Sequence, residues 1–234
     1  MITLSSDQHG LGDTLMLTSL AKNITEPVKV LLPKKVERFS ILFDKLANVE
    51  IIDDDKFRGY KSTPNFGSGP YIRQKLRGFF RNEAEYMDIR PLVLHTKPSS
   101  ELWAAEYLAD KPNPVIFVPT CSPQWASVRN LPVKLAHSVY AELREKGFTP
   151  IVCQSSSNFL DIGEHQLNDL DLSKYICLLR QAGEFVGANT GDFHVAVGVG
   201  ARATCIEPQS HSLFQTSEWR YKHQNIIYYT WPVS

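Results

Sequence analysis

The sequence predicts an α/β protein made of two lobes, each with its own parallel β-sheet. Short β-branched or apolar runs alternate with longer amphipathic runs along most of the 234 residues, which is typical of strands followed by helices. A polar, proline-rich segment at 109–114 interrupts this pattern, and a new alternation begins directly after it. We therefore expect one lobe at 1–110 and another at 111–234, with a ligand cleft between them beyond the strand ends.

In the first lobe, the expected strands are short apolar runs and the expected helices carry apolar residues at helical spacing. The strands are predicted at 2–4, 28–32, 49–52 and 92–95, and the helices at 13–23, 36–46 and 100–108. Between 53 and 90 the periodicity is lost, and Gly, Pro, Ser and Asn become frequent. This segment is predicted to be a long functional insertion with one helix near 72–80.

The second lobe repeats the alternation with clearer boundaries. Pro132 suits the first turn of a helix and Gly147 suits its end. The helices are predicted at 132–146, 173–182 and 192–199, and the strands at 115–118, 149–153, 185–188, 203–207 and 226–229.

Composition and charge argue against several functional classes. Hydrophobic residues make up 43% and charged residues 21% of the chain, as in ordinary globular proteins. Lys+Arg and Asp+Glu both number 25, so the chain lacks the overall basic field that grips nucleic acid. No run approaches the ~20 apolar residues that span a bilayer, and the first residues lack a leader pattern. We expect a cytoplasmic protein.

The cysteines and histidines do not suggest a metal site. All four cysteines lie in the second half of the chain, spaced too widely for a zinc ribbon or a redox pair. Two of them, Cys153 and Cys205, fall in strand-like apolar runs, where a free thiol behaves as a small hydrophobe. The seven histidines include no pair at the helical spacing of metal ligands. We expect reduced, buried cysteines, no metal and no cofactor.

The first motif lies between the first strand and the first helix. Its glycines, Gly10 and Gly12, let the backbone approach a ligand. Leu15 replaces the third glycine of the dinucleotide fingerprint, and no Gly-Lys-Ser/Thr follows, so neither standard nucleotide loop is present. Asp13 has two interpretations: it is a helix N-cap, or it is a general base that the helix N-terminus keeps ionised.

The second motif follows the strand at 115–118. The hydroxyl residues Thr120 and Ser122 come directly after this strand, and Arg129 stands just before the next helix. Small hydroxyl residues with a nearby cation suit a phosphate group. The structural alternative for Arg129 is an exposed loop residue.

The third motif, at 187–196, also joins a strand to a helix. Asn189, Thr190 and Gly191 are small residues that expose backbone N–H groups to a bound anion. His194 follows one turn into the helix. It either belongs to this anion site or is a histidine satisfied within the core.

The ordered set of motifs resembles glycosyltransferase family 9, the heptosyltransferase-like group that adds sugars during lipopolysaccharide core synthesis. The matching segments are 10–13, 129–132 and 189–194, and the resemblance extends over about 1–50 and 115–208. It implies a GT-B fold of two Rossmann-like lobes, and inverting, metal-independent transfer from a nucleotide diphosphate sugar. Family members are longer than this chain, which suggests a viral or accessory enzyme with a different acceptor.

The resemblance also implies roles for individual residues. Asp13 matches the catalytic base, and Arg129 stands where the family usually has a lysine that contacts the donor phosphates. Thr190 and Gly191 match the diphosphate-binding turn, with His194 after it. Two positions depart from the pattern. Asn189 replaces an acidic residue before the turn, and Gln154 stands where the family often has a glutamate for the nucleotide ribose, so the nucleotide is left open.

The insertion indicates what the acceptor is. Residues 56–82 hold seven Lys and Arg and no Asp or Glu, with aromatic residues between them. This composition suits an anionic acceptor, either a phosphorylated glycan of lipopolysaccharide type, which we favour, or a hydroxylated base in nucleic acid. A solvated loop over packed aromatics is the structural alternative. The candidate acceptor-binding residues are Arg73, Lys75, Arg77 and Arg81.

Two other functional classes compete with glycosyl transfer. A non-catalytic module that only binds a nucleotide sugar is favoured by Asn189 and by the missing ribose acid, whereas the retained Asp13 argues against it. A nicotinamide oxidoreductase is disfavoured by Leu15 in the glycine loop.

Overall fold

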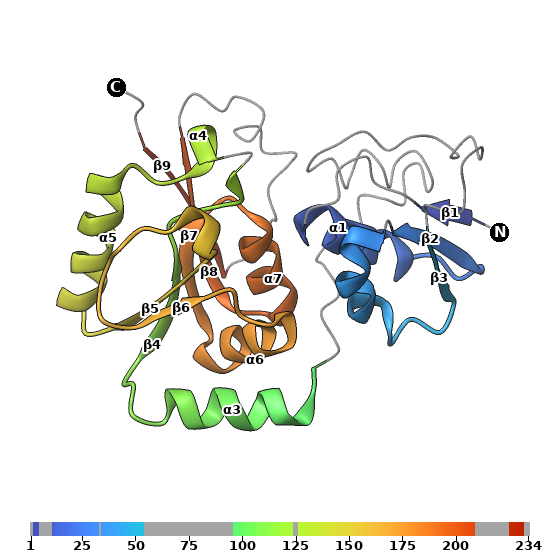
Figure 1. Cartoon of the computed structure of the whole chain (residues 1–234), viewed down its shortest axis with the longest axis horizontal. Coiled ribbons are helices and arrows are strands. Elements are labelled where there is room, and N and C mark those ends of the chain that lie inside the picture. The colour runs from blue at the N-terminus through green and yellow to red at the C-terminus, as the bar shows by residue number, and fades with distance from the viewer. Residues whose placement is uncertain are drawn as a thin grey trace. The chain divides into compact units, whose positions relative to one another are not determined.

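The computed structural model of the chain describes residues 2–4, 11–32, 34–53, 96–123, 126–208 and 225–231. These residues form two compact units, one with the described residues up to Asp53 and the other with those from Thr96 onward. Each unit contains a parallel sheet flanked by helices (Figure 1). The predicted α/β class with two parallel-sheet lobes is confirmed. The predicted strand at 92–95 and almost all of the insertion lie outside the described residues.

The first unit has a three-stranded parallel sheet of order β1-β2-β3. Its helix α1 buries three leucines, Leu15, Leu17 and Leu20. The helix predicted at 36–46 is a 3-10 helix, η1, whose three-residue repeat brings Phe39 and Leu42 to the same buried side. The elements of this unit are β1 (Ile2–Leu4), α1 (Leu11–Ala21), β2 (Val28–Leu32), η1 (Lys34–Phe43) and β3 (Val49–Asp53).

The second unit has a six-stranded parallel sheet of order β6-β5-β4-β7-β8-β9. The strands are β4 (Pro114–Val118), β5 (Thr149–Gln154), β6 (Gln166–Asn168), β7 (Glu184–Ala188), β8 (Arg202–Pro208) and β9 (Ile226–Trp231). The helices are α3 (Pro98–Leu108), α4 (Ala126–Arg129), α5 (Val133–Glu145), η5 (Ser156–Asn158), α6 (Leu172–Ala182) and α7 (Gly191–Val199). None of the helices in the described ranges is long and apolar enough to cross a bilayer.

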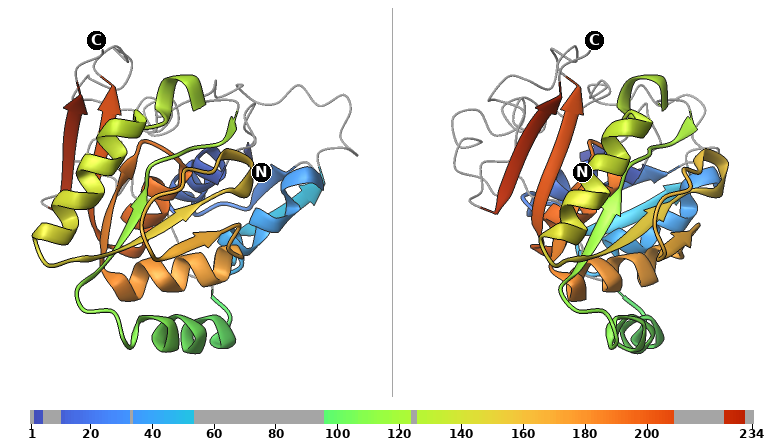
Figure 2. Two further views of the ribbon diagram at one scale, coloured as in Figure 1. Left: turned by 60° about the vertical axis from the view of Figure 1, so that its left-hand side comes forward. Right: turned by 90° about the vertical axis from the view of Figure 1, so that its left-hand side faces the viewer.

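Helices cover both faces of the six-stranded sheet (Figures 1 and 2). On one face, Ala136 of α5 joins a buried core with Phe117 of β4. On the other face, Phe193 of α7 packs against Phe185 of β7, with 6.2 Å between the ring centroids. Because successive side chains of a strand point to opposite faces, strands covered on both sides are apolar at nearly every position. This explains why the sequence shows these strands as continuous apolar runs.

The central strands β4 and β7 pair closely, with Val118 opposite Gly187. Gly187 is required here for steric reasons. A Cβ atom at this position would lie 2.6 Å from the carbonyl oxygen of Val118 and 3.0 Å from the ring of Phe185. The close pairing holds the carboxyl ends of β4 and β7 side by side.

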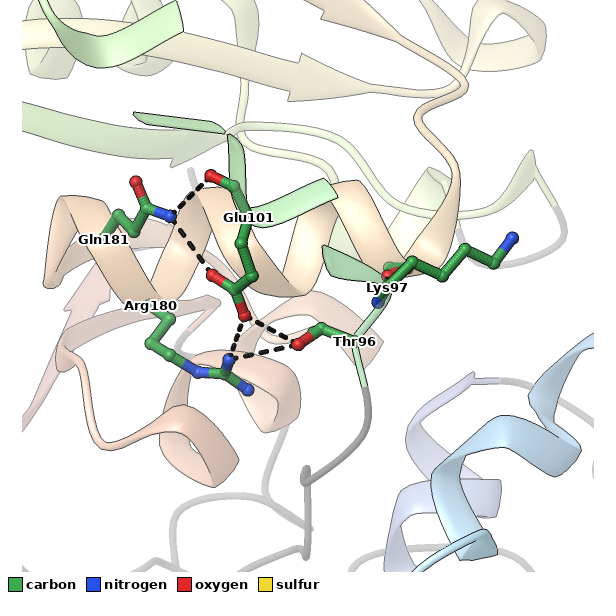
Figure 3. A network of polar contacts seen from close by, with 6 residues as sticks. Thr96, Lys97, Glu101, Arg180 and Gln181 are labelled. Atoms are coloured by element: carbon green, nitrogen blue, oxygen red, sulfur yellow. Dashed lines mark hydrogen bonds and ion pairs between the residues drawn. The ribbon is translucent and has the colours of Figure 1, made fainter. Parts of the chain in front are cut away.

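Helix α3 belongs to the second unit, because its first turn is bound to α6 (Figure 3). The Oε1 atom of Glu101 accepts hydrogen bonds from Arg180 Nη1 at 2.6 Å and from Thr96 Oγ1 at 2.7 Å. These contacts and the hydrogen bond that Arg180 Nη1 donates to Thr96 Oγ1 at 3.3 Å define the Glu101 cluster. The boundary between the units therefore lies at Thr96, and the predicted linker at 109–114 is a surface turn within the second unit.

Replacement of Gly187 by alanine tests the central pairing. We expect Gly187→Ala to lower the free energy of unfolding by about 1–3 kcal/mol, because β4 and β7 must separate to admit the methyl group. Urea unfolding monitored by circular dichroism measures the change. The control is Glu145→Ala at an exposed position of α5, which should stay within about 0.5 kcal/mol of the wild type. Equal stabilities of the two variants would contradict the steric explanation.

Candidate functional site

The topology of the second sheet creates one position suited to a ligand. The chain runs from β4 to β5 on one side and later returns to β7 on the other side of β4, so the strand order reverses between β4 and β7. Ligands of open parallel sheets bind beyond the carboxyl ends of the strands at such a switch point. The residues that follow β4 and β7 are the ones predicted to bind the donor, namely Thr120, Ser122, Asn189, Thr190 and Gly191.

The loop after β4 is held in place by two asparagines. The backbone N–H of Cys121 donates to Asn130 Oδ1 at 2.9 Å, and Asn158 Nδ2 donates to the carbonyl of Cys121 at 2.6 Å. The two asparagine side chains also bond each other, at 3.1 and 3.2 Å. Thr120 in this loop is buried, whereas Ser122 is exposed. Asn158 was not predicted as a site residue, because its contacts depend on a loop distant in sequence.

The turn after β7 is closed by Thr190, which caps helix α7. Its Oγ1 accepts the backbone N–H of Asp192 at 3.2 Å and donates to Asp192 Oδ2 at 2.9 Å. The Thr190 hydroxyl is therefore occupied within the turn, and an anion would meet the backbone N–H groups at the start of α7. The dipole of this nine-residue helix, which begins at Gly191, favours negative charge there.

Arg129 acts on both sides of the switch point. Loss of solvent around the imidazole, and then the positive charge of Arg129, lower the pKa of His194 to about 3. Burial raises the pKa of the Cys121 thiol to about 11, and Arg129 opposes this shift. The guanidinium is thus close enough to influence the loop after β4 and the first turn of α7 together. His194 is consequently a neutral imidazole at pH 7.

The half-buried Asp192, in the first turn of α7, lies beside the buried Tyr175 of α6. Burial raises the pKa of the Asp192 carboxyl, although the hydroxyls of Thr190 and Tyr175 beside it act in the opposite direction. Burial first, and then the nearby Asp192, raise the pKa of Tyr175. Neither residue was predicted as a contributor to the site. Asp192 belongs to the third motif. It could have been recognised as the residue whose backbone N–H bonds the Thr190 side chain when Thr190 caps α7.

A buried acid lies at the carboxyl end of β8. Glu207 is only 2% exposed, and its Oε1 accepts a hydrogen bond from Asn189 Nδ2 at 2.8 Å. The structure therefore places a carboxyl group next to Asn189, the position where the resemblance led us to expect an acidic residue. Glu207 was missed because an acid at a predicted strand end is usually solvent-exposed.

Gln154 at the end of β5 has a structural role. Its Nε2 donates to the carbonyl of Leu160 at 2.8 Å, and its Oε1 accepts the Leu160 N–H at 3.1 Å. Both ends of the amide are thus used to close the loop after β5. This residue stands where the resemblance led us to expect a ribose-binding glutamate.

The remaining predicted residues are described only in part. Asp13 and Gly12 fall in the first turn of α1, where the structure defines the backbone alone. Gly10 and the predicted acceptor-binding residues Arg73, Lys75, Arg77 and Arg81 lie outside the described residues. In the ranges that the structure covers, no three His, Cys, Asp or Glu side chains gather as a metal site would require. All four cysteines are free and buried, as expected.

Comparison with known proteins supports the fold. No family model and no curated protein sequence matches the chain. Among solved structures, ADP-heptose LPS heptosyltransferase II of E. coli superposes with a TM-score of 0.62 at 11% identity, covering 97% of this chain and 90% of that one. A family 9 glycosyltransferase of Veillonella parvula gives 0.63 at 10% identity, covering 99% and 85%.

A third similar structure carries a ligand. The dodecameric iron-containing heptosyltransferase TibC of enterotoxigenic E. coli, in complex with ADP-D-β-D-heptose, gives a TM-score of 0.62 at 15% identity. The alignment covers 97% of this chain and 61% of TibC. The chain therefore has the GT-B-like fold of heptosyltransferases and family 9 glycosyltransferases, and the fold implied by the three motifs is confirmed.

The low pKa of His194 predicts how stability depends on pH. The ordinary pKa of histidine is about 6.5, so the unfolded chain binds a proton at a pH where the folded chain does not. Stability is therefore lost as the pH falls from about 6.5 toward 3. Replacement His194→Gln should reduce this slope by up to about 1.4 kcal/mol per pH unit. Urea unfolding at pH 7, 5.5 and 4.5 measures it.

The exposed His137 of α5 provides the control for this measurement. The His137→Gln variant should keep the slope of the wild type. If His194→Gln also keeps that slope, the imidazole at 194 does not have the lowered pKa.

Proposed function

We propose that the protein is an inverting glycosyltransferase that moves a sugar from a nucleotide diphosphate sugar to a hydroxyl of an anionic acceptor. The observation that carries this proposal is the convergence of Arg129 and the α7 N-terminus at the switch point of the second sheet. The two features come from different loops, and both favour a bound anion. The fold is one that heptosyltransferases use, which supports a nucleotide sugar as the source of that anion.

The second unit is proposed to bind the donor. When the bond between the sugar and the diphosphate breaks, negative charge develops on the departing phosphate oxygen. Arg129 and the backbone N–H groups of Thr190 and Gly191 are fixed groups that stabilise this charge. Thr120 and Ser122, beyond β4, are proposed to bond phosphate oxygens, and neutral His194 is proposed to donate or accept a hydrogen bond. These groups take the role that a metal ion has in other transferases.

The first unit is proposed to bind the acceptor and to supply the base. Asp13 lies in the first turn of α1, where the helix dipole stabilises an ionised carboxylate. As general base it takes the proton from the acceptor hydroxyl, whose oxygen then attacks the anomeric carbon of the sugar. Attack from the face opposite the diphosphate inverts the configuration of that carbon. Gly10 and Gly12 allow the acceptor to approach the backbone.

The acceptor is proposed to be a phosphorylated glycan of lipopolysaccharide type. This rests on the positive charge of Arg73, Lys75, Arg77 and Arg81 in the insertion, and a hydroxylated nucleic-acid base is the alternative with the same charge. A binding module without catalysis is a further alternative. The structural role of Gln154 favours it, because that residue has no amide group left for a nucleotide ribose.

A thermal-shift screen tests the donor site. The ligands are ADP, GDP, UDP and CDP, their glucose conjugates and ADP-D-β-D-heptose. A ligand at about 100 times its dissociation constant should stabilise the wild type by roughly 2.7 kcal/mol. Arg129→Ala should abolish most of this stabilisation, whereas Arg144→Ala, an exposed arginine of α5, should retain it. If no ligand stabilises the wild type, the donor-site proposal is wrong.

Replacement of Asp13 tests the catalytic role. We expect Asp13→Asn to lower the rate of nucleoside diphosphate release, with an acceptor present, by about 10²–10⁴-fold, because the amide cannot accept the proton. The assay uses the conjugate that stabilises the wild type. Binding of that conjugate should be unchanged, and the exposed Asp44→Asn should turn over normally. Equal, vanishing turnover in all three proteins would favour the binding module.

A further inference from the structure

Glu207 is a buried acid for which the proposed transfer reaction has no use. It is 2% exposed at the carboxyl end of β8, and it lies on the same face of the strand as Cys205, which is fully buried. Burial of a carboxyl group is costly unless hydrogen bonds compensate, so a buried acid at a sheet edge usually has a defined partner. The side chain of Asn189 donates a hydrogen bond to Glu207.

The direction of this hydrogen bond fixes the Asn189 carboxamide. Asn189 Nδ2 donates to Glu207 Oε1 at 2.8 Å, so the NH2 end of the amide is turned toward β8. A carboxamide has its donor and acceptor on different arms, and an ionised carboxylate can only accept. As long as Glu207 is ionised, the reverse orientation would bring two oxygens together. The acceptor Oδ1 of Asn189 is therefore the arm directed away from β8.

Asn189 lies where a ligand would meet this oxygen. It immediately precedes Thr190, the cap of α7, and it follows β7 at the switch point. Among the residues that the structure describes, the contact with Glu207 is the only hydrogen bond of the Asn189 side chain. A ligand whose diphosphate occupies the α7 N-terminus would bring its neighbouring groups to Asn189. The groups next to a diphosphate in a nucleotide sugar are the ribose and the sugar, and both carry hydroxyls.

We infer that Glu207 is a positioning residue that turns the Asn189 Oδ1 atom toward the ligand, where it accepts a hydrogen bond from a hydroxyl of the ribose or of the transferred sugar. The inference rests on the proposed donor site. The hydrogen bond to Asn189 Oδ1 makes the site selective for ligands that carry this hydroxyl.

Three variants separate positioning from a purely structural role. Glu207→Gln allows either orientation of the Asn189 amide, because glutamine both donates and accepts. Asn189→Ala removes the acceptor. The double variant Asn189→Asp/Glu207→Gln restores the hydrogen bond in the opposite direction. The NH2 group of the new glutamine donates to the new carboxylate at 189, whose other oxygen faces the ligand as an acceptor. Circular dichroism and thermal unfolding of the ligand-free proteins verify that each variant folds.

The readout is a ratio of affinities, measured by calorimetry with the nucleotide that stabilises the wild type. Three ligands are compared: the nucleoside diphosphate, its 2′-deoxy form and its sugar conjugate. Loss of one hydrogen bond should cost about tenfold in affinity, and only for ligands that carry the recognised hydroxyl. If the hydroxyl belongs to the sugar, Glu207→Gln and Asn189→Ala weaken the conjugate alone. If it belongs to the ribose, they equalise the diphosphate and its 2′-deoxy form.

The double variant should recover the selectivity of the wild type. The inference is overturned if the single variants weaken all three ligands by the same factor, which is what a structural role predicts, or if they change none of them. Both results would leave the donor site intact, because the wild type would still bind. Failure of the wild type to bind any of the ligands would overturn the donor site and this inference with it. If Glu207→Gln does not fold, the comparison of Asn189→Ala with the double variant decides.

Discussion

The parallel pairing of β4 with β7 is the interaction on which the second unit depends. The chain leaves these two strands in opposite lateral directions, and the loops that follow them consequently diverge at the sheet edge. The pairing requires a residue without a side chain at Gly187. It also brings Arg129 close enough to influence the first turn of α7, although Arg129 and Thr190 are 61 positions apart in the sequence. The proposed anion site is therefore a product of strand order as much as of residue type.

Charge at this edge is arranged in layers. Arg129 and the α7 N-terminus supply positive potential, whereas the acids Asp192 and Glu207 are withdrawn behind the turn and bonded to Thr190 and Asn189. The shifted pKa values follow from the same arrangement. Burial lowers the pKa of His194 to about 3, so His194 adds no positive charge beside Arg129 at neutral pH, and burial raises the pKa of Asp192. A half-buried cation beside acids that are bonded to neighbouring side chains suits a ligand of concentrated negative charge.

The sequence was sufficient for most strands but only partly for the site. Strands such as β4 and β5 are buried on both faces, and their unbroken apolar runs located them to within one residue. The start of α7 at Thr190 and Gly191 was predicted because a helix start has a local signature, and their role in binding stays a prediction. Glu207, Asn158 and the role of Gln154 were missed, since each depends on a partner brought close only by folding. The short elements β6 and α4 carry no periodicity, and Asp13 keeps its two interpretations.

The Glu101 cluster has a consequence for how such a chain can diversify. Arg180 of α6 bonds Glu101 in the first turn of α3 and also Thr96, the residue at which the second unit begins. The start of the second unit is therefore held by contacts within that unit. A change in the length or composition of the chain before Thr96 would leave the residues of this cluster unaltered. The first 95 of the 234 residues are in this sense an exchangeable module. If the proposed roles of the two units hold, descendants of one ancestor could change the acceptor by varying the first unit and keep the donor by conserving the second.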